Sequence, residues 1–147
     1  MKHTSQRGID LIKRHEGLSL EAYLCPANKW TIGYGHTRTA HEGDKITERL
    51  AEELLKQDLK FTEIRVNALT ADLDLKQNQF DALVSFAFNV GCAAFAKSTL
   101  LKRIREGADN EEISKQFNRW VYAGGKKLNG LIKRRQDEAN EYLRDQL

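Results

Sequence analysis

Residues 15–37 read HEGLSLEAYLCPANKWTIGYGHT, a stretch in which glycines alternate with aromatic and β-branched side chains. Aromatic and β-branched residues favour strands, and residues 26–29 have the composition of a turn between two strands. We therefore expect a small antiparallel hairpin or a three-stranded sheet within residues 18–43.

Helical patterns flank this stretch on both sides. Residues 5–15 carry closely spaced apolar side chains after Thr4 and Ser5, either of which can cap a helix. After Thr47, another capping residue, apolar side chains recur with a mainly 3.6-residue period, which predicts a long helix over residues 48–66. That stripe consists of Leu50, Leu54, Leu55, Leu59, Ile64 and Val66.

The C-terminal half is expected to be helical. Asp74 opens a segment with a broad apolar face, and Gly91 is placed to end it in a left-handed conformation. Ser98 can cap the next helix, and Gly107 closes that helix. Two more helices are expected over residues 110–120 and 130–145. The sequence therefore predicts an α+β fold with one small sheet near the N-terminus and six or seven helices.

Composition indicates an ordinary globular protein. The 147 residues are 40% hydrophobic and 31% charged, which suits one compact domain or two lobes that share a long helix. The chain shows no apolar signal peptide and no transmembrane anchor, so we expect it to be made and kept in the cytoplasm. In that compartment Cys25 and Cys92 are expected to be free thiols.

Basic residues gather in the C-terminal half. Between Lys97 and Arg135, eleven basic residues outnumber four acidic ones, so this part has a net charge of +7 and the remainder −4. A surface of this kind attracts nucleic acid, an anionic membrane or an anionic polymer, but it is equally an ordinary solvated helix face. Both interpretations stay open at this point.

Four residues near the N-terminus can carry chemistry, and each has an ordinary alternative. Glu16 lies between a helix end and a glycine, a position that suits a general acid, although such a glutamate is most often a surface residue. Cys25 can be a nucleophile or a small buried side chain, and Thr31 can hold a water or simply extend a strand. His36 can act as a base, a ligand or a hydrogen-bonded structural residue. Without HExxH or a similar spacing, no metal site is expected.

The order of these residues resembles a known family. Glu16, eight residues, Cys25, five residues and Thr31, followed by Ile-Gly-Tyr-Gly-His, are similar to the catalytic segment of phage-type lysozymes, glycoside hydrolase family 24. The closest likeness is to the endolysins of lambdoid phages and their prophages. The resemblance covers nearly the whole chain, because it extends to residues 85–91, 95–101, 119–125 and 130–135.

The resemblance implies one lysozyme domain over residues 1–147, with two lobes. A small β lobe at about residues 17–46 is joined by a linking helix, about 47–66, to a helical lobe. The helical lobe comprises about residues 67–147 and the helix 5–15. The substrate cleft is expected between the sheet and the helices.

The implied activity is that of an endolysin. Such an enzyme hydrolyses the β-1,4 glycosidic bonds between N-acetylmuramic acid and N-acetylglucosamine in bacterial peptidoglycan and releases phage progeny by host cell lysis. No cofactor is implied. The expected partners are peptidoglycan and a holin-type membrane permeabiliser, and we expect a monomer that binds no nucleic acid and inserts into no membrane.

Three residues match catalytic positions of the family. Glu16 corresponds to the general acid that protonates the departing glycosidic oxygen, and Thr31 to a residue that holds the attacking water or stabilises developing charge. Cys25 stands where another branch of the family has an aspartate. A neutral thiol is a poor base, so Cys25 is either partly ionised or positions a water together with Thr31. Spacing alone leaves inversion and retention at the anomeric carbon both open.

Substrate contacts are expected from six more residues. They lie in the segment after the hairpin, at helix ends of the C-terminal half and in the last helix, where one of two adjacent arginines is expected to pair with Glu16. The six residues are His36, Asn89, Gly91, Ser98, Arg134 and Arg135.

Two other classes of function are alternatives. With Cys25 as a thiolate nucleophile and His36 as its base, the chain is a peptidase or amidase that acts on the peptides of the wall. With no catalysis at all, the basic helices form a module that binds the wall or nucleic acid, and Glu16 then has no role.

Overall fold

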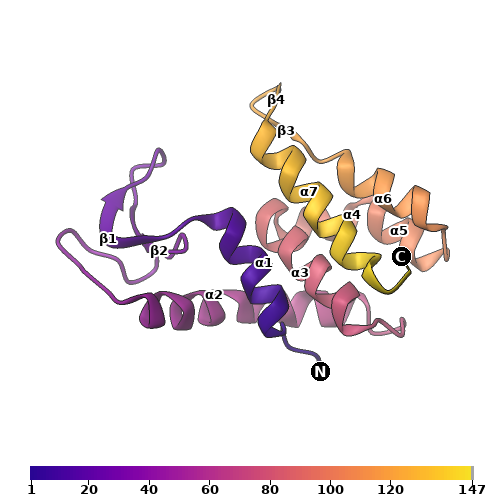
Figure 1. Cartoon of the computed structure of the whole chain (residues 1–147), viewed down its shortest axis with the longest axis horizontal. Coiled ribbons are helices and arrows are strands. Elements are labelled where there is room, and N and C mark those ends of the chain that lie inside the picture. The colour runs from indigo at the N-terminus through magenta and orange to yellow at the C-terminus, as the bar shows by residue number, and fades with distance from the viewer. Residues whose placement is uncertain (147) are drawn as a thin grey trace. The chain divides into compact units, whose positions relative to one another are not determined.

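The computed structural model describes residues 1–146, which form seven α-helices, one short 3₁₀ helix and two small antiparallel sheets (Figure 1). This confirms the predicted α+β class. In chain order the elements are α1 (Gln6–Glu16), β1 (Ser19–Leu24), β2 (Trp30–Gly33), α2 (Glu48–Leu69), α3 (Gln77–Val90), α4 (Cys92–Lys97), α5 (Thr99–Arg105), α6 (Asn110–Asn118), β3 (Tyr122–Ala123), β4 (Lys126–Lys127), α7 (Asn129–Tyr142) and η1 (Arg144–Gln146).

The contacts divide the chain into two compact units. The hairpin unit is Ile12–Phe61, and the helical unit combines Met1–Leu11 with Thr62–Leu147. One boundary falls inside α1 and the other inside α2, so both helices contribute residues to both units.

The hairpin unit is built on the predicted pair of strands. β1 and β2 run antiparallel, with Tyr23 opposite Thr31, and the register is irregular between Ser19 and Tyr23. The turn forms as predicted, because the Cys25 amide donates to the Lys29 carbonyl oxygen at 3.0 Å. The third strand of the alternative prediction is reduced to one bridge between Glu21 and Lys45.

Helix α2 begins where the sequence predicts and ends three residues later. The Thr47 hydroxyl caps it by accepting the Leu50 amide at 3.1 Å. The predicted apolar stripe is partly wrong, because Leu50 and Ile64 are 45% and 52% exposed. Three members of the predicted stripe are buried, and Ala51 takes the inward place expected of Leu50. The buried apolar residues of α2 are Ala51, Leu55, Leu59 and Val66.

Helix α3 forms the centre of the helical unit and packs against α4 and α7. It begins at Gln77 and not at Asp74, because the Gln79 side chain accepts the Lys76 amide at 2.9 Å and so sets the first turn. At its end Gly91 has φ 97° and ψ 144°. The positive φ fits the predicted use of glycine, but this ψ lies outside the left-handed helical region that we expected.

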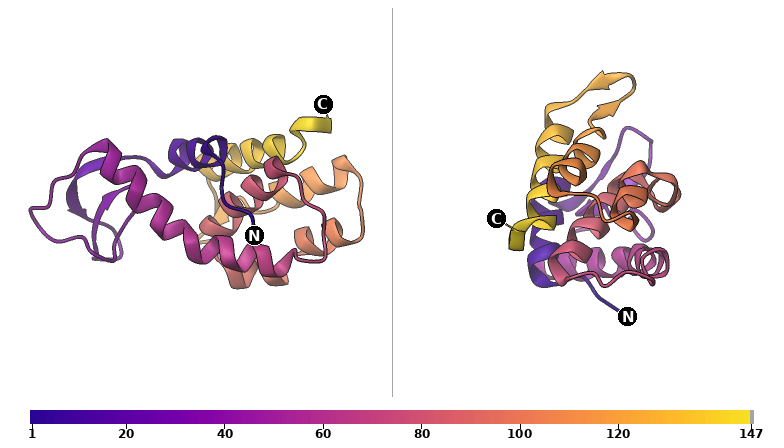
Figure 2. Two further views of the ribbon diagram at one scale, coloured as in Figure 1. Left: turned by 90° about the horizontal axis from the view of Figure 1, so that it is seen from below. Right: turned by 90° about the vertical axis from the view of Figure 1, so that its right-hand side faces the viewer.

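Two elements of the helical unit are absent from the sequence-based prediction. The first is helix α4, which lies between Gly91 and Ser98. Ser98 also caps α5 as predicted, because its Oγ atom accepts a hydrogen bond from the Leu101 amide at 3.1 Å. The β3–β4 hairpin follows α6, which ends at Asn118 and not at residue 120 as predicted. Gly124 and Gly125, both at positive φ, form its two-residue turn. Figure 2 shows this hairpin projecting beyond the start of α7.

A buried charge network joins α7 to α3. Glu138 is fully buried and accepts hydrogen bonds from Ser85 Oγ at 2.6 Å, from Arg134 Nε at 3.1 Å and from Arg135 Nη1 at 2.6 Å. The Arg135 guanidinium also lies over the ring of Phe86, 5.1 Å from its centroid. Both arginines are therefore structural parts of the core, since removing Glu138 leaves two buried positive charges without this partner.

None of the helices within residues 1–146 combines the length and the apolar character that crossing a bilayer requires. Cys25 and Cys92 are both free thiols, as predicted.

Candidate active site

Glu16 is the last residue of α1 and belongs to the hairpin unit. Gly17 follows it with φ 73°, a conformation that suits glycine and turns the chain from the helix into β1. The carboxyl group of Glu16 is half-buried and lies against the backbone of Gly35, because a Cβ atom added at Gly35 would be 3.5 Å from Glu16 Oε1. A Cβ atom at position 35 would be in ordinary van der Waals contact with the carboxylate, so it is the positive φ of 87° that favours glycine there.

A tight turn presents Gly35 to Glu16. The Ile32 amide donates to the His36 carbonyl oxygen at 2.9 Å, and the His36 amide donates back to the Ile32 carbonyl oxygen at the same distance. Gly33 and Gly35 have φ of 66° and 87°, which are conformations that other residues rarely adopt. The geometry of this turn thus accounts for the two glycines of the Ile-Gly-Tyr-Gly-His sequence.

The side chain of His36 connects the turn to α2 through hydrogen bonds. Its Nδ1 atom lies 2.9 Å from Asp58 Oδ2, and its Nε2 atom lies 2.7 Å from Thr39 Oγ1. The side chain is 4% exposed, so it is buried with both ring nitrogens engaged. These contacts fit the structural alternative for His36, and its predicted role in substrate binding stays a prediction. The alternative in which His36 is the base for a Cys25 nucleophile loses its support for the same reason.

Asp58 is a residue that the sequence analysis missed. It lies on α2 between Leu55 and Leu59, which are buried. A carboxylate next to the buried stripe of a helix was the available signal, because such a group needs a hydrogen-bonding partner. Its partner, His36, is 22 residues away along the chain.

The hairpin brings Cys25 and Thr31 together. Thr31 is 4% exposed and its hydroxyl donates to the Lys29 carbonyl oxygen at 3.0 Å. Hydrogen bonds from the backbone of Lys29 and from the side chain of Thr31 lower the pKa of the Cys25 thiol below that of an ordinary cysteine. A thiol with a lowered pKa is ionised in a larger fraction of molecules at neutral pH, so more molecules carry the thiolate that can accept a proton.

All three predicted catalytic residues lie in the hairpin unit. Glu16 provides a carboxyl group at the end of α1, and Cys25 and Thr31 provide a thiol and a hydroxyl group next to the turn that joins β1 to β2. This set provides a proton donor and a group that can hold and deprotonate a water, which are the requirements of acid–base hydrolysis.

The other predicted contacts belong to the helical unit. Asn89 accepts a hydrogen bond from Arg135 Nη2 and is exposed, as is Gly91. Ser98 is 7% exposed and its hydroxyl is engaged in capping, so it is not available as the substrate contact that we predicted. Arg134 and Arg135 are 3% and 1% exposed. The predicted pairing of one arginine with Glu16 joins different units and stays a prediction.

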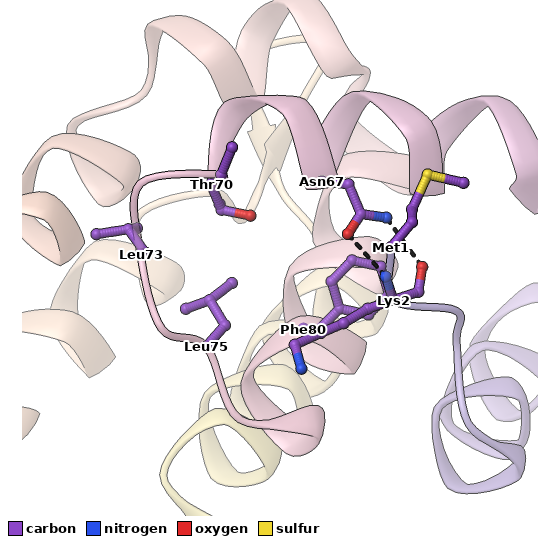
Figure 3. Close-up of a pocket in the computed structure, with 8 residues that line it drawn as sticks. Met1, Lys2, Asn67, Thr70, Leu73, Leu75 and Phe80 are labelled. Carbon is purple, nitrogen blue, oxygen red and sulfur yellow. Dashed lines mark hydrogen bonds between the residues drawn. The ribbon is translucent and has the colours of Figure 1, made fainter.

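A pocket of about 420 Å³ lies elsewhere in the helical unit (Figure 3). Asn67 holds the N-terminal segment at its edge, since it accepts the Lys2 amide at 3.0 Å and donates to the Lys2 carbonyl oxygen at 2.9 Å. Phe80, Leu73 and Leu75 make much of its lining apolar, and no carboxylate takes part. Within residues 1–146, no three histidine, cysteine or acidic side chains are grouped as a metal site needs.

Comparison with known proteins identifies the family. A family model described as phage lysozyme matches residues 13–138, which is most of the chain. The chain belongs to the phage lysozyme family. Among relatives of the phage lysozyme family, the endolysin of Acyrthosiphon pisum secondary endosymbiont phage 1 is 46% identical over 140 residues, covering 92% of this chain and 94% of that one. The endolysin of Bacillus phage B103 is 44% identical over 142 residues, and this chain spans 53% of its length.

Solved structures agree with this family assignment. The muramidase domain of SpmX from Asticaccaulis excentricus superposes with a TM-score of 0.88 and is 41% identical, with 97% of this chain and 99% of that chain covered. The fold is therefore the α+β fold of phage lysozymes. Some relatives, such as one from Bacteriophage PS119 that is 36% identical over 129 residues, carry the name SAR-endolysin.

The pairing of Cys25 with Thr31 predicts how the thiol reacts. In a Cys92→Ser background only Cys25 is left to react with iodoacetamide, and the thiolate is the reactive form. Because its pKa is lowered, we expect the alkylation rate to rise at a lower pH than that of a cysteine in an unfolded peptide. Adding Thr31→Val removes one of the hydrogen bonds responsible, so the rise should move to higher pH.

The measurement is the alkylation rate between pH 6 and 10, followed by mass spectrometry, with circular dichroism to verify that each variant is folded. A profile that matches the unfolded peptide, or one that Thr31→Val leaves unchanged, contradicts the hydrogen-bonding arrangement.

Proposed function

We propose that this chain hydrolyses the β-1,4 glycosidic bonds between N-acetylmuramic acid and N-acetylglucosamine, with Glu16 as the general acid. At the coarser level the chain is a phage endolysin that cleaves peptidoglycan and a glycoside hydrolase of the lysozyme type. The observation that carries the residue assignment is the arrangement of Glu16 against the Gly35 turn, with the Cys25–Thr31 pair on the adjoining hairpin.

Glu16 supplies the proton that the leaving group needs. When the bond between the anomeric carbon and the glycosidic oxygen breaks, that oxygen takes the proton from the Glu16 carboxyl group and leaves as a hydroxyl. The closed turn from Ile32 to His36 keeps the backbone of Gly35 against the carboxyl group, which restricts the positions that the side chain can occupy.

Cys25 and Thr31 handle the attacking water. The Thr31 hydroxyl accepts a hydrogen bond from the water, and the Cys25 thiolate takes the proton that the water loses as its oxygen bonds to the anomeric carbon. The products are two shorter glycan chains, one with a new reducing end. Solvent then returns the proton from the thiol to the Glu16 carboxylate. The lowered pKa of Cys25 supports this role, because a thiol of ordinary pKa is rarely ionised at neutral pH.

The route to the wall is part of the same proposal. We propose that the enzyme acts as a monomer in one lysozyme domain and leaves the host cytoplasm through a holin-type permeabiliser. The name SAR-endolysin, which several relatives carry, provides the alternative of a membrane-linked release.

The first test concerns Glu16. Glu16→Gln keeps the size of the side chain but offers no proton, so we expect it to remain folded and to lose lysis by at least about 100-fold. The assay incubates purified cell walls with enzyme and measures new reducing ends and new amino groups. Glu42→Gln, which changes an exposed carboxylate of the same unit, is the matched control and should keep full activity. New amino groups without reducing ends would show an amidase or peptidase and reject the glycosidase.

The second test concerns Cys25. If its thiolate accepts a proton from water, then Cys25→Asp should keep much of the activity, because a carboxylate serves the same purpose. Cys25→Ala should lose most of it, by about 100-fold or more. Cys92→Ser is the control and should remain active. Near-full activity of Cys25→Ala would assign the water to Thr31 alone.

A further inference from the structure

The turn from Gly33 to His36 is in contact with α1 and α2 along its whole length. Its two end residues face α2, and the two residues between them face α1. The partners are Ala51 for Gly33, Lys13 for Tyr34, Glu16 for Gly35 and Asp58 for His36. All of these residues belong to the hairpin unit. On the side of α1 the turn therefore depends on Glu16 itself and on Lys13.

Lys13 contacts the turn through the aromatic ring of Tyr34. It lies one helical turn before Glu16 on α1, so the two side chains are on the same face of the helix. The Nζ atom of Lys13 lies over the Tyr34 ring, 5.5 Å from its centroid, a distance at which an aromatic face attracts a cation. Tyr34 is 8% exposed. Two residues on one face of α1 thus contact two adjacent residues of the turn.

The ammonium group of Lys13 is also held by α2. It donates to Glu52 Oε1 at 2.8 Å, and the two side chains are 29% and 22% exposed, so solvent screens this ion pair only in part. The hydrogen bond to Glu52 raises the pKa of Lys13 above that of an ordinary lysine, which keeps the group charged at neutral pH. One positive charge therefore connects α1, α2 and the turn.

We propose that Lys13 is a positioning residue for the general acid, because its contact with Tyr34 keeps the backbone of Gly35 against the Glu16 carboxyl group. The proposal rests on the proposed function and adds to it a residue that acts through the turn. Without the ammonium group, the Tyr34 ring loses the attraction that holds it against α1, and the Glu16 carboxyl group can occupy more positions. A catalytic group misplaced by about 1 Å can lower the rate by up to about 100-fold.

The test replaces Lys13 with methionine, which keeps an unbranched side chain and removes the charge. Lys56 Nζ remains 3.5 Å from Glu52, so the carboxylate keeps a partner and we expect the variant to fold, which circular dichroism verifies. On purified cell walls, kcat for new reducing ends should fall about three- to thirtyfold, the effect of losing a cation over an aromatic ring. KM should change by less than about twofold, because the lost contact does not involve substrate. Lys13→Arg should return kcat to within about twofold of the wild type, since a guanidinium also stacks on Tyr34 and pairs with Glu52.

Lys56→Met is the matched control. It removes the other ammonium group that pairs with Glu52, but from a lysine that is 43% exposed and also pairs with Glu53 at 3.7 Å. Its kcat should stay within about twofold of the wild type. Equal losses for Lys13→Met and Lys56→Met would show only an effect of charge near Glu52 and would overturn the proposal. A wild-type kcat for Lys13→Met, a loss confined to KM, or a loss that Lys13→Arg does not restore would overturn it too.

Amide hydrogen exchange measures the turn independently of activity. The Ile32 and His36 amides donate within the turn, so they exchange when it opens. We expect both to exchange at least about fivefold faster in Lys13→Met and at the wild-type rate in Lys56→Met. If the wild type releases no reducing ends, or Glu16→Gln keeps full activity, the proposed function fails, and faster exchange still supports the contact of Lys13 with the turn. Unchanged exchange of both amides in Lys13→Met would reject that contact whatever the activity.

Discussion

The contact between His36 and Asp58 is the constraint that organises the active-site segment. It joins a turn of only five residues to a long helix, and it buries the imidazole with both nitrogens engaged. The backbone of that turn then lies against the Glu16 carboxyl group through Gly35. Thr31 directly precedes the turn, so its place on the hairpin is held by the same contact. Breaking one partner of such a buried pair leaves the other without compensation, which is why the pair is costly to disrupt.

The helical unit also contains interior polar side chains, and a different hydrogen-bond network pairs them. Between α3 and α7, Glu138 accepts hydrogen bonds from Ser85 and from two arginines. Nearby, the rings of Phe117 and Trp120 pack edge to face against the ring of Phe86. Each unit therefore depends on polar or charged side chains in its interior that are paired by hydrogen bonds. Among residues 1–146, the exposed cations from α6 to the start of α7 have no acidic partner, and this separates them from the paired charges that maintain the fold.

Local signals in the sequence predicted a large part of this structure. Some features depend only on contacts between residues that are close in the sequence, so they can be predicted without knowledge of the fold. They are the capping hydroxyls of Thr47 and Ser98, the turn after Cys25 and the glycines of the Ile32–His36 turn. Glu16, Cys25 and Thr31 were found because their spacing resembles that of a known family. The family is confirmed, while their catalytic roles remain the proposal made above.

Features that depend on distant contacts were missed or misjudged. The inward place of Ala51 in α2 follows from how that helix packs, and the choice between Leu50 and Ala51 cannot be made from periodicity alone. The role of His36 depends on Asp58, 22 residues away, and the buried state of the two arginines depends on Glu138. The Gly124–Gly125 turn was a local signal that we did not use, since two strands of two residues each show no clear alternation.

The most direct test of the account is a double-mutant cycle between His36→Asn and Asp58→Asn, read as free energies of unfolding in urea. If the pair holds the turn, each single variant should lose about 3 kcal/mol or more, and the double variant should lose little beyond either one. The coupling energy is then about as large as the single losses. Losses that add to within about 0.5 kcal/mol would contradict the account, because they would show that the two side chains contribute independently.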